Sequence, residues 1–152
     1  MFGARVCAYS GRMDAKTRAS APAAVATAAL ATVFLVEDSE VIRERLLYML
    51  GEVPGTEVVG HAETADSAVA QIAAIRPAVV VLDVKLKESS GMQVLRVIKQ
   101  QMPRIVVIVL TNYASPVFRK RYEEAGADYF LDKSNEFEVI RTILMQHCLG
   151  NC

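Results

Sequence analysis

Five polar residues follow or interrupt apolar stretches of this chain, and their types suit phosphoryl-transfer chemistry. They are three carboxylates, a hydroxyl and an ammonium group: Glu37, Asp38, Asp83, Thr111 and Lys133. Carboxylates that share one place oppose each other's ionisation, so a cation must lie among them, and Mg²⁺ prefers oxygen ligands of this kind. Beside such an ion a carboxylate can accept a phosphoryl group covalently.

In this hypothesis Asp83 is the nucleophile, Lys133 places a compact positive charge on the phosphoryl group, and Thr111 donates a hydrogen bond to one of its oxygens. Each residue alone has a simpler explanation. Asp38 with Ser39 could cap a helix, Asp83 could lie in a turn, Thr111 could be an ordinary loop residue and Lys133 a solvated one. Their joint occurrence at matching strand ends favours a site.

Apolar runs of strand length show how residues so far apart in sequence could meet. The runs lie at 32–36, 57–61, 78–82, 105–110 and 128–131. The third and fourth are apolar at nearly every position, which is typical of parallel strands covered by helices on both faces. Ligands of such sheets bind outside the carboxyl ends of the strands, and four of the runs end at the candidate residues.

The segments between these runs have apolar residues at helical spacing, as at Ile42, Leu46 and Met49. Prolines follow the first three helical segments, and we expect Ser115 and Ser134 to cap the last two. Five alternations of strand and helix predict an α/β fold, a (βα)5 doubly wound, five-stranded parallel sheet in the flavodoxin-like order 2-1-3-4-5.

The 152 residues, 53% of them hydrophobic, suit one domain with a real core. We expect 1–31 to be a disordered N-terminal extension, 32–148 the domain and 149–152 a C-terminal tail. The extension resembles a secretory leader superficially, but its alanine-rich part runs directly into the first strand. Met13 is an alternative start.

Charge, hydropathy and cysteine content argue against nucleic-acid binding, a membrane span and disulfide bonds. Four basic residues lie in the extension against one acid, which leaves the domain mildly acidic, so we expect no direct binding to nucleic acid. No segment is apolar enough for a membrane span. Cys7, Cys148 and Cys152 form no CxxC pair, so we expect reduced thiols and a cytoplasmic protein.

Four segments resemble the receiver domain of bacterial two-component response regulators. They are VFLVEDSE at 33–40, VVVLDVKLKESSGMQVL at 79–95, VIVLTN at 107–112 and GADYFLDKS at 126–134. The resemblance implies that a sensor histidine kinase or a histidine phosphotransfer protein phosphorylates Asp83. It also implies that Glu37 and Asp38 organise Mg²⁺ together with Asp83, and that the backbone carbonyl of Lys85 completes the metal shell.

The resemblance further implies that Thr111 and Phe130 form a switch pair. In the family, phosphate draws the hydroxyl inward, and the aromatic residue moves into the vacated space. The surface that changes is built by the fourth helix, the fifth strand and the fifth helix, and an output protein would bind there. Formation of a homodimer on phosphorylation is a further possibility. The basic run 119–121 lies on this face and is either a solvated surface or a determinant of partner choice.

Several residues depart from the family pattern. Lys87 replaces the usual proline, so we expect a looser loop after Asp83. Asn112 replaces a small residue, and we expect it to narrow the entrance for the phosphoryl group. Phe130 replaces the commoner tyrosine and has no hydroxyl. Lys85 and Tyr113 are expected to overhang the site and to alter the lifetime of the phosphate.

Two other classes remain open. Aspartate-nucleophile phosphatases and phosphotransferases resemble one another in a second acid two residues after the nucleophile, and this chain has Lys85 there. The other class is an interaction domain without the switch. We expect a regulatory protein with at most self-catalysed phosphorylation and dephosphorylation. The few residues after Cys148 are too short for an output domain, so we expect it to stand alone.

Overall fold

The computed structural model describes residues 31–150, with side chains described to His147, and five apolar runs form one parallel sheet in the order β2-β1-β3-β6-β7. The strands are β1 (Ala31–Val36), β2 (Thr56–Ala62), β3 (Val79–Leu82), β6 (Val106–Thr111) and β7 (Tyr129–Asp132). This order confirms the predicted flavodoxin-like topology. Of the expected extension and tail, 1–30 and 151–152 lie outside the described residues, whereas Ala31 belongs to β1 and 149–150 belong to the last helix.

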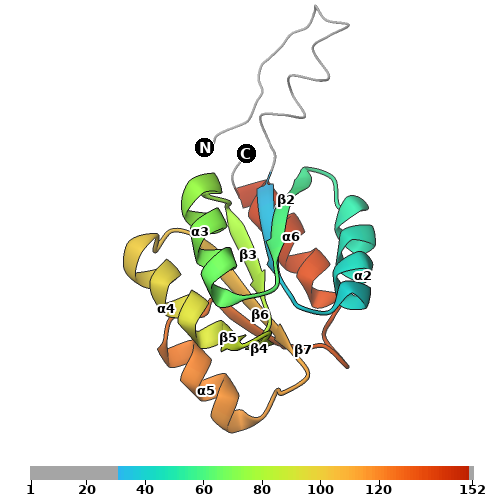
Figure 1. The fold of residues 1–152 in the computed structure, drawn as a ribbon. Coiled ribbons are helices and arrows are strands. Elements are labelled where there is room, and N and C mark those ends of the chain that lie inside the picture. Colours follow the sequence, from blue (N-terminus) through green and yellow to red (C-terminus); the bar gives the residue numbers. More distant parts are fainter. Residues whose placement is uncertain (1–30, 151–152) are drawn as a thin grey trace, which may run out of the picture.

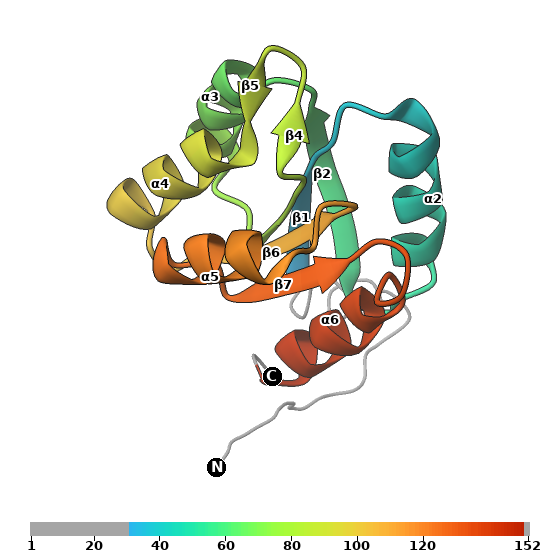
Figure 2. The ribbon, with the colours of Figure 1, turned by 90° about the horizontal axis from the view of Figure 1, so that it is seen from below.

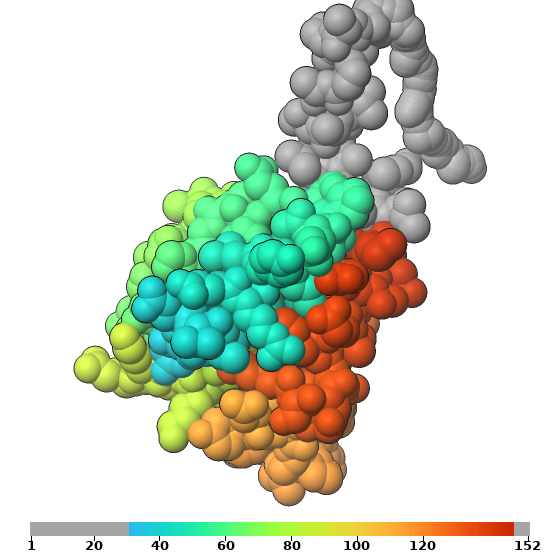
Figure 3. Space-filling view, turned by 90° about the vertical axis from the view of Figure 1, so that its right-hand side faces the viewer, coloured from blue at the N-terminus to red at the C-terminus, as the bar shows by residue number. Residues whose placement is uncertain are grey.

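Five helices cover the sheet: α2 (Glu40–Gly51), α3 (Ala65–Ile75), α4 (Gly91–Gln101), α5 (Pro116–Glu124) and α6 (Val139–Gly150). Figures 1 and 2 show α2 and α6 on one face and α3, α4 and α5 on the other. The helices α2 and α6 adjoin on the surface in Figure 3. An ion pair of 3.1 Å joins Arg141 of α6 to Glu52, the residue that follows α2. No described helix is long and apolar enough to cross a membrane.

The central strand β3 explains why both faces need helices. All four of its residues are buried, and they alternate between two separate cores. Val79 and Val81 face the core under α2 and α6, whereas Val80 and Leu82 face the core under α3, α4 and α5. Each such side chain contributes about 1.5–3 kcal/mol when fully buried.

Of the two serines predicted to cap helices, one does so and the other does not. Ser115 caps α5, because its hydroxyl accepts a hydrogen bond from Phe118 N at 3.2 Å. The prediction that Ser134 caps the last helix is wrong, since α6 begins at Val139. Ser134 N instead donates to Asp132 Oδ1 at 2.8 Å, and Glu136 N donates to Asp132 O at 2.7 Å, so a turn occupies this segment.

The start of α4 is packed tightly against the end of β3. Gly91 N donates to Val84 O at 2.7 Å. A Cβ atom at position 91 would overlap the carbonyl oxygen of Asp83, whose carbon would also lie within 3.1 Å. Glycine is therefore needed here for close approach of two backbones, and this contact fixes the segment after Asp83.

The substitution Gly91→Ala should destabilise the fold because backbone atoms must move to admit the methyl group. We expect a loss of unfolding free energy of about 1–3 kcal/mol, measured by urea denaturation. Gly51→Ala is the matched control, because a Cβ there meets nothing within 4 Å. Equal stabilities of the two variants would contradict this view of the junction.

Candidate functional site

Three carboxylates from two neighbouring strands meet at the carboxyl end of the sheet. Glu37 and Asp38 directly follow β1, Asp83 directly follows β3, and the last residues of these strands, Val36 and Leu82, are paired in register. Each of the three acids has an oxygen within 4.8 Å of the others. The structure therefore brings together the acids that the strand pattern predicts to meet.

Lys133 reaches the same cluster from the edge strand β7. Its Nζ lies 2.7 Å from Glu37 Oε1 and 3.0 Å from Asp83 Oδ2, and only 7% of its side chain is exposed. The backbone helps to hold it there, because Lys133 N donates to Thr111 O at 2.9 Å. The ammonium group thus bridges two buried carboxylates, an arrangement that offsets part of their desolvation cost.

Burial dominates the electrostatics of this cluster. It raises the pKa of Glu37 from 4.5 to about 7, although the hydrogen bond from Lys133 opposes the change; the charge of Asp83 adds to it. Burial acts to lower the pKa of Lys133, but the hydrogen bonds and charges of Glu37 and Asp83 outweigh it, so this pKa is raised. Lys133 therefore stays charged.

The donor set fits a divalent cation. One ammonium group cannot balance three ionised carboxylates, and the charge of Asp83 adds to the effect of burial in raising the pKa of Glu37. Mg²⁺ takes oxygen ligands and is commonly bound through one or two carboxylates. Glu37, Asp38 and Asp83 could hold such an ion.

Two neighbouring residues to which the sequence assigned no role at Glu37 orient this side chain. Ser39 N donates to Glu37 Oε2 at 3.1 Å, and Arg43 Nη1 donates to Glu37 O at 2.9 Å. Arg43 also forms an ion pair with Glu63 at 3.2 Å. Arg43 occupies a helix position beside the predicted apolar stripe of Ile42, but no feature of the sequence indicated that the following strand would supply Glu63.

The two residues expected to form a switch lie on adjacent strands and are both buried. Thr111 is fully buried at the end of β6, and its Oγ1 accepts from Tyr113 N at 3.0 Å. Phe130 on β7 is 3% exposed and belongs to the core under α5. Its ring lies 5.9 Å from that of Tyr122, centroid to centroid, at an angle of 51°.

Lys85 lies two residues after Asp83, Tyr113 lies two residues after Thr111, and their side chains contact one another. The Lys85 Nζ is 5.6 Å from the centre of the Tyr113 ring, and 47% of Tyr113 is exposed. This distance is within the range of a cation–π contact. Asn112, between Thr111 and Tyr113, is exposed.

The loop after Asp83 contains a short strand pair that the sequence did not predict. Residues Lys85–Leu86 (β4) and Ser89–Ser90 (β5) form a short antiparallel pair, and Lys87 Nζ lies 2.5 Å from Glu63 Oε1. Lys87 thus forms an ion pair with the segment after β2, a contact that the sequence did not predict. That the loop is looser without proline stays a prediction.

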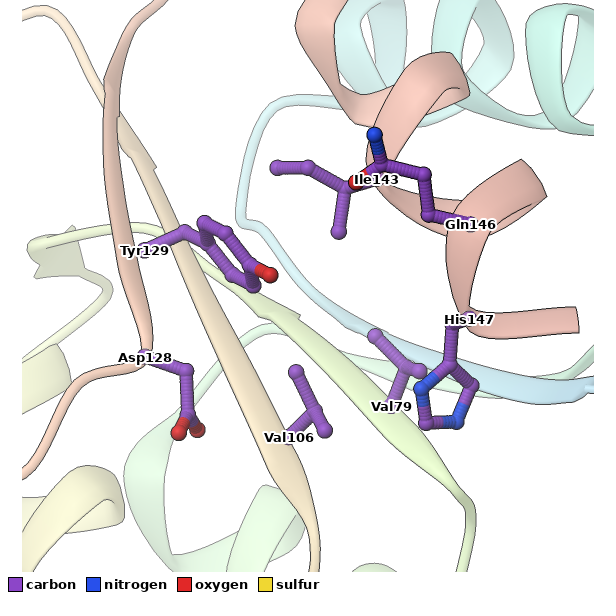
Figure 4. Close-up of a pocket in the computed structure, with 7 residues that line it drawn as sticks. All are labelled: Val79, Val106, Asp128, Tyr129, Ile143, Gln146 and His147. Carbon is purple, nitrogen blue, oxygen red and sulfur yellow. The ribbon is translucent and has the colours of Figure 1, made fainter. Parts of the chain in front are cut away.

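A cavity of ≈ 350 Å³ lies at the opposite end of the sheet, far from the acids (Figure 4). Its lining includes Val79 and Val106, the first residues of β3 and β6, and His147 of α6. Figure 4 shows the Tyr129 ring and the side chain of Ile143 directed into it. None of the candidate site residues lines this cavity.

Fold and site together define a class: a parallel α/β domain with an acidic cluster and a lysine at the carboxyl edge of its sheet. Residues 33–145 match the family described as "Response regulator receiver domain". The chain belongs to this family. It is a response regulator receiver domain of two-component signalling.

Relatives and solved structures agree. The chain is 42% identical over 83 residues to the "DNA-binding transcriptional activator DevR/DosR" of Mycobacterium tuberculosis, covering 55% of this chain and 38% of the relative. It is 35% identical over 103 residues to a "Protein-glutamate methylesterase/protein-glutamine glutaminase 1" of Syntrophus aciditrophicus, covering 66% and 29%. The chain thus spans only about a third of the length of these two curated relatives.

Among solved structures, a two-component response regulator of the LuxR family from Aurantimonas sp. SI85-9A1 superposes with a TM-score of 0.72 at 27% identity, covering 80% of this chain and 86% of that one. The signal receiver domain of a putative Luxo repressor protein from Vibrio parahaemolyticus gives a TM-score of 0.72 at 28% identity, covering 80% and 92%.

The raised pKa of Glu37 predicts a specific pH dependence of stability in metal-free protein. Between pH 4.5 and about 7 the folded protein retains a proton on Glu37 that the unfolded chain has released, so the unfolding free energy contributed by this group falls as pH rises through that window. The variant Glu37→Gln should lack this fall. Urea denaturation at pH 5, 6, 7 and 8 in chelator measures it.

The control for this experiment is Glu44→Gln, an exposed carboxylate on α2, which should follow the wild-type curve. If wild type and Glu37→Gln keep a constant difference in unfolding free energy from pH 5 to 8, the burial argument for Glu37 is wrong.

Proposed function

We propose that this domain accepts a phosphoryl group on Asp83 and signals its phosphorylation state to a protein partner. The observation that carries the proposal is the convergence on Asp83 of two further carboxylates and of the Lys133 ammonium, whose Nζ lies 3.0 Å from Asp83 Oδ2. A carboxylate nucleophile next to a fixed cation is the arrangement that phosphoryl transfer to aspartate requires.

The proposal assigns Mg²⁺ to Glu37, Asp38 and Asp83, with the backbone carbonyl of Lys85 as a further ligand. When bound, the ion would neutralise charge on the carboxylates and on the phosphoryl oxygens. Ser39 and Arg43 support this role through their hydrogen bonds to Glu37.

The side chains of the domain supply positioning and charge. A carboxylate oxygen of Asp83 forms a bond to phosphorus as the bond from phosphorus to a donor imidazole nitrogen breaks, and the electron pair of that bond returns to the imidazole. Lys133 balances negative charge on the phosphoryl oxygens. Thr111 Oγ1 accepts from Tyr113 N, which leaves its own hydrogen for a phosphoryl oxygen.

The donor in this proposal is a sensor histidine kinase or a histidine phosphotransfer protein. Thr111 and Phe130 would transmit the change to the face formed by α5, β7 and α6, where an output protein or a second copy of the chain would bind. Exposed apolar residues on these elements, Val117, Tyr129, Val139 and Met145, support a role in binding. The proposal also keeps 32–148 as the functional domain and the cytoplasm as its location.

The methylesterase name belongs to relatives of which this chain matches less than a third, so it carries no activity over to this domain. A multiple-turnover aspartate phosphatase is disfavoured by Lys85, whose side chain lies over Tyr113 where such enzymes carry an acid. We therefore propose a regulatory role, with phosphorylation and dephosphorylation of the domain itself.

Incubation with acetyl phosphate should add one phosphoryl group to the wild-type chain, detected by intact mass, and only when Mg²⁺ is present. Asp83→Asn should abolish the adduct because the nucleophile is lost. Asp66→Asn, an exposed carboxylate on α3, is the matched control and should be phosphorylated like wild type. An undiminished adduct on Asp83→Asn would refute the assignment.

Removing the Lys85 side chain should shorten the lifetime of the phosphorylated state. The Lys85 ammonium lies 5.6 Å from the centre of the Tyr113 ring. If this pair covers the approach to Asp83, as we propose, Lys85→Ala should admit water and speed dephosphorylation by about two- to tenfold. The decay of the adduct mass after removal of donor measures this rate. Lys120→Ala, an exposed lysine on α5, controls for lost charge, and an unchanged rate in Lys85→Ala would count against the idea.

A further inference from the structure

Arg119 on α5 behaves differently from its two basic neighbours. Its Nη1 donates to Phe130 O at 2.9 Å, and its guanidinium carbon lies 5.0 Å from the centre of the Phe130 ring. Lys120 and Arg121 are exposed on the same helix. The side chain that the sequence offered as a partner contact is therefore engaged within the domain.

A second contact connects Arg119 to the segment that carries Lys133. Its Nη2 lies 3.8 Å from Glu136 Oε1, and the same Oε1 accepts a hydrogen bond from Asp132 N at 3.0 Å. Asp132 and Glu136 flank Lys133 in the turn between β7 and α6. Arg119 thus spans from α5 to both sides of the segment 130–136.

The position of β7 explains why such a brace is useful. β7 is an edge strand, paired only with β6 among the described residues, so it lacks a second neighbour to hold its backbone. A planar guanidinium can donate to a backbone carbonyl and stack against a ring at the same time, whereas the ammonium of lysine is a point charge without a planar face. Both contacts act on Phe130, which is 3% exposed.

We propose that Arg119 is a positioning residue that holds Phe130 inward before any phosphoryl group is present. The structural part of this inference concerns the resting domain; its signalling consequence rests on the proposed function. A domain held in the inward arrangement has part of its conformational change already made. Phosphorylation then needs to supply less free energy to complete the change.

The test uses the full chain labelled with 4-fluorophenylalanine and read by ¹⁹F NMR without Mg²⁺ or phosphodonor. Phe130 is assigned among the five phenylalanines by the loss of its resonance in Phe130→Leu. In wild type the Phe130 signal should be insensitive to exchange of H₂O for D₂O, because the ring is buried. Arg119→Gln should increase the solvent-sensitive population about tenfold, since a charge-assisted hydrogen bond and a cation–π contact are both lost.

Lys120→Gln and Arg121→Gln lose the same charge from the same helix and should give the wild-type spectrum. Arg119→Lys keeps the charge but not the planar fork, so an intermediate exposed population is expected. Urea denaturation shows whether Arg119→Gln folds. If it folds and its Phe130 signal is as protected as in wild type, the inference is overturned. If it does not fold, the same result for Arg119→Lys overturns the inference.

A second arm separates this inference from the proposed function. Acetyl phosphate with Mg²⁺ should phosphorylate Arg119→Gln several-fold more slowly than wild type. If wild type takes no phosphoryl group at all, the proposed function fails, but the spectra without donor still decide the role of Arg119.

Discussion

The buried contact between the Lys133 ammonium and the carboxylates of Glu37 and Asp83 determines which strands must lie side by side at the carboxyl edge of the sheet. Two acids with so little exposure repel each other and lose hydration, and a single cation reached from β7 offsets only part of this cost. That contact requires β1, β3, β6 and β7 to be adjacent and parallel. It also requires Gly91, because the segment after Asp83 must pass close to the start of α4.

The incomplete compensation is what the proposed function would use. A pocket with more negative charge than its lysine can balance would favour a divalent cation, and such a cation would in turn allow a phosphoryl group to approach. Lys133 belongs at once to this pocket and to the 130–136 segment, which Arg119 connects to α5. Lys133 contacts Asp83, and Arg119 contacts the segment that contains Lys133, so direct contacts connect Asp83 with a helix on the surface.

The sequence predicted the layers of this fold because continuous apolar runs such as that of β3 can only be buried between helices. It also predicted which residues meet at the sheet edge, since parallel strands carry their carboxyl ends to one side. It did not predict the β4–β5 pair, the tether of Lys87 to Glu63 or the late start of α6. Those features, like the Arg119 contacts, depend on side chains that meet only after the chain has folded, and charged residues have no periodicity that reveals their partners.

Calorimetric titration of metal-free protein with Mg²⁺ measures whether the acidic cluster lacks positive charge. We expect a single bound ion per chain in the wild type and a clear loss of affinity in Asp38→Asn, a variant that leaves the contacts of Lys133 intact. Equal binding by the two proteins, or no binding by either, would contradict this expectation.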